Sequence, residues 1–161
     1  MWPGAPAAGL PSRGGRTAHV TATPRAVELI EIAAMAAADK LATDIIAYDV
    51  SDQLVITDAF LLCTAANDRQ VRSIVDEIEL KLSQAGAKPV RREGERDGRW
   101  VLLDYVDVVI HVQHEDERVF YALERLWKDC PVIRLPEPVT AGPAGLARGR
   151  GPAASRNGDT R

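Results

Sequence analysis

The chain has 161 residues, enough for one compact domain with extensions, because folded domains typically contain about 100 to 150 residues. No apolar run approaches the roughly 20 residues that span a bilayer, and residues 1–19 lack the apolar core of a signal peptide. Two cysteines, Cys63 and Cys130, are too few for a disulfide or metal framework, so we expect both to be reduced and structural. We therefore expect a soluble, cytoplasmic protein.

Charge is unevenly divided along the chain. The net charge is −3, and residues 1–22 and 136–161 each carry +2, which leaves −7 on residues 23–135. Such a domain should repel nucleic-acid backbone and prefer a basic macromolecular partner, although negative charge also simply keeps proteins in solution. The two ends are rich in Ala, Gly, Pro and Arg, which predicts a disordered extension over 1–22 and a disordered basic tail over 136–161.

The first half of the domain alternates between helices and strands. Thr23 before Pro24 is typical of a helix start, and Asn67 caps a second helix whose end is marked by Gly86. Apolar runs between these two helices predict two neighbouring strands. The predicted elements are a helix over residues 24–42, strands over 44–50 and 59–65, and a helix over 68–85.

The second half begins with a short charged strand and ends with a helix. Pro and Arg in residues 89–92 favour a strand at a sheet edge. Two apolar strands follow over 100–105 and 108–112, and three acids at 115–117 then begin a helix that we expect to end near Cys130. This order predicts an α/β domain with a single mixed β-sheet flanked by helices.

Several short motifs occur together in a specific order. The carboxyl half contains Glu93-Gly94-Glu95, Trp100, Asp104, the run DVVIHV at 107–112, and Leu126-Trp127, and the amino half contains KLATDIIAYDV at 40–50, ITD at 56–58 and CTA at 63–65. Over residues 23–135 the chain thereby resembles the ribosomal silencing factor family, also called iojap-like. The resemblance implies a nucleotidyltransferase-like arrangement of the sheet. Val106 stands where many family members carry Gly, which affects the local turn and the direction of Tyr105.

A catalytic function has weak support in the sequence. Asp104 and Asp107 could hold Mg²⁺ for nucleotidyl transfer, but residues three apart on a strand project to opposite sides, and no phosphate-binding Gly-rich loop is present. His111 and His114 lack the fixed spacing of a helical metal pair, and we interpret His111 as a hydrogen-bonded structural residue. Cys63 has no base beside it in sequence. We expect no catalytic residue, no metal and no cofactor.

A binding surface is better supported. Alternation along the strand places Trp100, Leu102 and Asp104 on one face and Tyr105 on the other, and an outward-facing Trp with nearby carboxylates is typical of an interface anchor. The alternative is that Trp100 is a core aromatic. By resemblance, this region contacts ribosomal protein fourteen of the large subunit. The candidate contacts are Trp100, Leu102, Asp104, Tyr105 and Glu93.

The function implied by the resemblance is steric. A protein on the joining face of the large ribosomal subunit would block docking of the small subunit and repress translation when nutrients fall. The resemblance also implies a homodimer, and we expect no membrane association and no sequence-specific nucleic-acid binding. The alternatives are an Mg²⁺-dependent nucleotidyltransferase-like enzyme and a factor for large-subunit assembly, which would associate with immature particles.

Overall fold

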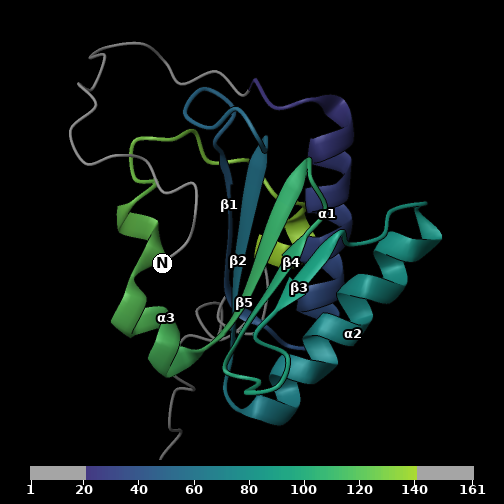
Figure 1. Ribbon diagram of the computed structural model, residues 1–161, viewed down its shortest axis with the longest axis vertical. Coiled ribbons are helices and arrows are strands. Elements are labelled where there is room, and N and C mark those ends of the chain that lie inside the picture. The colour runs from purple at the N-terminus through teal and green to yellow at the C-terminus, as the bar shows by residue number, and fades with distance from the viewer. Residues whose placement is uncertain (1–20, 141–161) are drawn as a thin grey trace, which may run out of the picture.

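A mixed sheet of five strands forms the centre of the structure, a computed structural model in which residues 21–140 are described (Figure 1). The strands are β1 (Thr43–Asp49), β2 (Ala59–Ala65), β3 (Arg91–Glu93), β4 (Trp100–Asp104) and β5 (Val108–His114). The helices are α1 (Pro24–Asp39), α2 (Asp68–Gln84), α3 (Glu115–Tyr121), the 3₁₀ turn η1 (Leu123–Arg125) and α4 (Glu137–Thr140). The strand order is β1-β2-β5-β4-β3, with β2 and β5 parallel and the other pairs antiparallel. The predicted fold class is confirmed.

Side-chain caps begin the two long helices as predicted. The Thr23 hydroxyl accepts a hydrogen bond from the Ala26 N–H at 3.1 Å, and the Asn67 amide oxygen accepts one from the Gln70 N–H at 2.8 Å. These bonds satisfy N–H groups that have no partner within the first turn of a helix. Gly86 follows α2 with a φ of 84°, the left-handed conformation that glycine adopts without steric cost.

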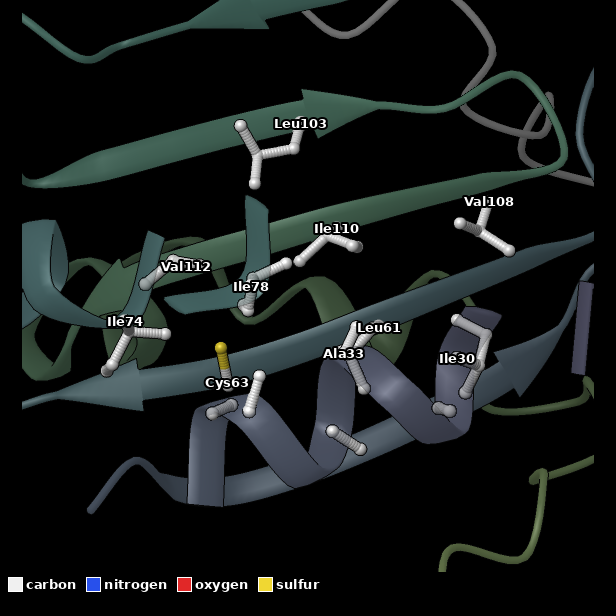
Figure 2. Packing of buried hydrophobic residues seen from close by; sticks show 14 of the residues in the cluster. Ile30, Ala33, Leu61, Cys63, Ile74, Ile78, Leu103, Val108, Ile110 and Val112 are labelled. Atoms are coloured by element: carbon white, nitrogen blue, oxygen red, sulfur yellow. The ribbon is translucent and has the colours of Figure 1, made fainter. Parts of the chain in front are cut away.

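The larger core lies between one face of the sheet and helices α1 and α2, which cover the same side of the sheet in Figure 1. Figure 2 shows Leu61 and Ile110 of the central strands near Ile30 of α1 and Ile78 of α2. All four side chains are fully buried. Val101 and Leu103 also belong to this core, so the alternation predicted for β4 is confirmed on this face.

A second, smaller core covers the opposite face of β1, β2 and β5. It is built from Tyr48, Phe60, Leu62 and Val109 of the strands together with Trp127 and its neighbours after α3. The rings of Phe60 and Trp127 meet edge to face with centroids 4.7 Å apart. The segment after β5 therefore covers part of this face, and α3 lies across the sheet from α1 and α2 (Figure 1).

The helix predicted from residue 115 to near Cys130 is wrong in its length. α3 ends at Tyr121, and Ala122 adopts a left-handed conformation with a φ of 44° before the 3₁₀ turn. The break redirects the chain so that Leu123 and Trp127 both reach the second core. Burial of these large side chains outweighs the local helix propensity of the sequence, which contains no Gly or Pro here.

Both ends of the described segment are attached to the domain. The backbone N–H groups of Thr21 and Ala22 donate to the carboxylate of Asp49, and Val139 of α4 packs in the larger core. Thr21, Ala22 and Val139, which lie within the predicted extensions, thus contact the domain, and most of each extension falls outside the described residues. Within residues 21–140, none of the helices has the length and apolar character that crossing a bilayer would require.

Candidate partner-binding surface

Trp100 lies at the rim of the second core and is half-buried. Its indole N–H donates a hydrogen bond to His111 Nδ1 at 3.1 Å, and its ring lies against Tyr121 of α3 with centroids 4.7 Å apart. One part of the ring therefore supports the fold, and the other part is open to solvent. Trp100 is therefore partly a core aromatic, and its role as a surface anchor stays a prediction.

His111 is the structural residue that the sequence predicts. It is 3% exposed, and burial, aided by the positive charge of Arg118, lowers its pKa to about 3. The imidazole is therefore neutral at physiological pH, and its Nδ1 accepts the bond from Trp100. A neutral imidazole held this way fixes the orientation of the Trp100 ring.

The other residues of the predicted set divide between the two faces of the sheet. Leu102 is 4% exposed within the second core, and Tyr105 is 6% exposed within the larger core on the opposite face. Burial raises the pKa of Tyr105 to about 12. Asp104 is partly exposed and Glu93 is exposed, and both lie on the same face as Trp100. The structure therefore brings Trp100, Asp104 and Glu93 to one accessible surface. Leu102 is buried on the same face, and Tyr105 is buried on the opposite face.

Arg91 moderates the negative charge of this surface. Its guanidinium lies 3.3 Å from the Glu93 carboxylate and 3.9 Å from that of Asp104, and all three groups are at least partly exposed. Exposed pairs of this kind contribute little to stability, typically about 0 to 1 kcal/mol. Both carboxylates can therefore exchange this contact for a Lys or Arg of a partner at small cost.

Exposed apolar side chains on and after α3 were not predicted from the sequence. We call these side chains the α3 patch: Val119, Phe120, Tyr121 and Leu126 are 80%, 80%, 50% and 45% exposed, and the rings of Phe120 and Tyr121 are in contact with centroids 5.0 Å apart. Only Arg118 of α3 is buried, where it pairs with Glu124 and donates to the Thr64 hydroxyl at 2.9 Å. The run of three apolar residues at 119–121 was the available signal, because a helix can turn only part of such a run toward the core.

The residues considered for catalysis have structural partners. Asp104 accepts a hydrogen bond from the Val106 N–H at 2.8 Å, and His114 Nδ1 accepts one from the Asp116 N–H at 3.1 Å. Within residues 21–140 no group of three or more His, Cys, Asp or Glu side chains could hold a metal ion. Cys63 and Cys130 are buried and free, as predicted, and burial raises their pKa values to about 12 and about 11. Both thiols are protonated at neutral pH.

Comparison with known proteins gives consistent matches. The family model for the ribosomal silencing factor during starvation matches residues 23–158. The ribosomal silencing factor of Bacillus subtilis is 43% identical over 107 residues, covering 66% of this chain and 91% of the relative. The chloroplastic Iojap protein of Zea mays is 33% identical over 106 residues, covering 64% of this chain and 45% of the relative.

Solved structures agree with these matches. A crystal structure of a Chromobacterium violaceum protein has a TM-score of 0.61 at 35% identity, covering 63% of this chain and 84% of that one. A crystal structure from Bacillus halodurans has a TM-score of 0.60 at 38% identity, covering 67% and 98%. With the family model matching more than half of its length, this chain belongs to the ribosomal silencing factor family of ribosome-associated translation regulators.

Proposed function

We propose that this chain binds ribosomal protein fourteen of the large ribosomal subunit and blocks joining of the small subunit, repressing translation in the cytoplasm when nutrients are scarce. The observation that carries the proposal is the accessible surface on β3 and β4, where half-buried Trp100 shares one face with Asp104 and Glu93. An aromatic anchor with a carboxylate rim suits a basic protein partner, as does the charge of −7 on residues 23–135.

The mechanism needs only occupancy of the joining face. A typical interface covers roughly 800 Å² per partner and excludes any other molecule from that area. His111 holds the Trp100 ring in place before binding, so little side-chain freedom is lost when the partner arrives. Asp104 and Glu93 would then face Lys or Arg side chains of the partner, which favours rapid and specific association.

Sucrose-gradient co-sedimentation with isolated large subunits tests the proposal. The protein should migrate with large subunits, and small subunits added afterwards should form fewer joined ribosomes. A preference for immature particles would instead favour a role in large-subunit assembly. Absence from the large-subunit peak would contradict the proposal and make nucleotide and Mg²⁺ binding the next assay.

Variants of Trp100 separate its two roles. Trp100→Ala removes the anchor, and a central Trp typically contributes about 2 kcal/mol or more to binding, so affinity for large subunits should fall about thirtyfold. Trp100→Phe also loses the bond to His111 but keeps an aromatic ring, so it should lose stability and retain most of the binding. Equal binding by wild type and a folded Trp100→Ala variant would remove Trp100 from the interface.

We also propose that the chain forms a homodimer through the α3 patch. Phe120 and Val119 are each 80% exposed on a short helix, and nothing in residues 21–140 covers them. Exposed large apolar side chains that lie together commonly mark a protein interface. A two-fold dimer would bring the same patch of each copy into contact, which is the simplest way to bury it.

A further inference from the structure

One end of the sheet carries a group of exposed aliphatic side chains that the proposed Trp100 surface does not use. This is the end where β1 and β4 finish and where β2, β3 and β5 begin. The sheet-end patch consists of Val55, Ile56, Val90 and Val106, which are 104%, 65%, 67% and 52% exposed. Exposed apolar side chains are unremarkable singly, but a group of them at one site indicates an interaction surface.

Backbone hydrogen bonds hold the segments of the patch together. The Asp58 N–H, at the end of the β1–β2 loop, donates to the Asp107 carbonyl in the β4–β5 turn at 3.0 Å. The Val90 N–H donates to the Asp104 carbonyl at 2.7 Å. The β1–β2 loop and the segment before β3 are therefore both attached to the β4–β5 turn, which carries Val106.

Val106 is in a conformation that its side chain disfavours. Its φ is 70°, in the left-handed region where a β-branched residue is strained. The turn around it is closed by bonds from the Asp107 N–H to the Tyr105 carbonyl and from the Tyr105 N–H to the Val108 carbonyl, both at 2.9 Å. The valine side chain is half exposed and so recovers little of this cost by burial. A contact with a partner would bury the Val106 side chain and offset part of this cost.

The rim of the patch is acidic. Asp52, Asp58, Asp104 and Asp107 are all at least partly exposed on the same loops and turns. Of the described cations, Arg91 lies 3.9 Å from the Asp104 carboxylate, and exposed Lys88 precedes Val90 by two residues. A second copy of this chain would bring like charges against the rim, whereas a basic protein would be attracted to it.

We infer that the sheet-end patch is a second contact surface for the basic ribosomal partner, an inference that rests on the proposed function. Asp104 belongs to both surfaces. Trp100 and Asp104 are four residues apart on β4, a distance of about 13 Å along a strand. An interface of roughly 800 Å² per partner is about 30 Å across if it is circular, so one partner can cover both surfaces. The partner should place aliphatic side chains against Val55, Ile56 and Val106 and basic ones against the rim.

The test compares binding and stability in matched variants. Val106→Gly removes the side chain and relieves the strain, so the variant should unfold at a higher denaturant concentration but bind large subunits at least threefold more weakly. The double variant Val55→Ser with Ile56→Ser should bind at least tenfold more weakly. Leu41→Gly is the control, because Leu41 is 63% exposed, has a φ of 63°, and lies at the opposite end of the sheet. It should gain stability and bind like wild type.

The other outcomes distinguish this inference from the proposed function. If wild type binds, Trp100→Ala weakens binding, and the sheet-end variants bind normally, the inference is overturned and the proposed function stands. If wild type does not co-sediment with large subunits, both fall. If the sheet-end variants shift the molecular mass measured by light scattering, the patch is a contact between copies and the inference is again overturned.

Discussion

At the scale of single residues, the buried imidazole of His111 makes the stability of this chain depend on pH. Burial lowers its pKa to about 3 in the folded state, whereas an exposed imidazole in the unfolded chain titrates near 6.5. Between these values the unfolded state binds a proton that the folded state excludes. The contribution of His111 to the free energy of unfolding is therefore fully present above about pH 6.5. Below that pH the free energy of unfolding decreases as the pH falls, by at most about 1.4 kcal/mol per pH unit.

A substitution at this position isolates the effect. His111→Gln offers an amide oxygen to the Trp100 N–H but does not titrate, so its free energy of unfolding should fall less between about pH 7 and about pH 5.5 than that of wild type. Urea unfolding of both proteins at several pH values in this range measures the difference, and carboxylates elsewhere contribute equally to both. Parallel pH dependences would show that His111 is accessible to protons in the folded state.

At the scale of the elements, the break after α3 concentrates strain in one residue. Ala122 has a φ of 44°, which costs an L-residue about 1 to 2 kcal/mol. Ala122→Gly should therefore stabilise the fold by about 1 kcal/mol, since glycine adopts this conformation freely but loses more backbone entropy on folding. Thermal unfolding measures the change, and Ala38→Gly near the end of α1 should act in the opposite direction. Destabilisation by Ala122→Gly would show that the methyl group itself supports the turn.

The same break explains which elements the sequence predicts well. β2 and the start of α2 depend on local signals, an apolar run and an Asn cap, and the structure places both where these signals do. The end of α3 depends on where the chain must bend so that Leu123 and Trp127 join Phe60 in the second core. No local signal encodes that position, because it is set by strands that lie more than 50 residues earlier in the chain.

At the scale of the whole molecule, the two faces of the sheet differ in how they are covered. Helices α1 and α2 pack on one face through the larger core, whereas α3 and the residues after it cover only part of the other face (Figure 1). Alternation along β4 correctly predicted which residues share a face, but it could not show that Leu102 is covered while Trp100 remains at the rim. The difference in burial between Leu102 and Trp100 depends on how far the chain after β5 extends over the sheet, which is a property of the tertiary structure.

The α3 patch and the Trp100 surface meet, and this contact links the proposed dimer to the proposed silencing. Tyr121 belongs to the patch and packs against Trp100 with ring centroids 4.7 Å apart. A second copy seated on α3 would therefore crowd the edge of the ring that the ribosomal partner needs. Dimerisation and large-subunit binding should compete, so the apparent affinity per chain should weaken as protein concentration rises.

Phe120→Ser tests this competition. Phe120 is 80% exposed, so the substitution should leave the fold intact, shift the molar mass measured by light scattering from dimer to monomer, and increase apparent affinity for large subunits at high protein concentration. Leu80→Ser is the control, because Leu80 is 51% exposed on α2, across the sheet from α3, and this variant should keep both the dimer and its concentration dependence. A monomeric Phe120→Ser variant that binds no better than wild type would mean that the two surfaces act independently, because the Trp100 ring would then remain accessible in the dimer.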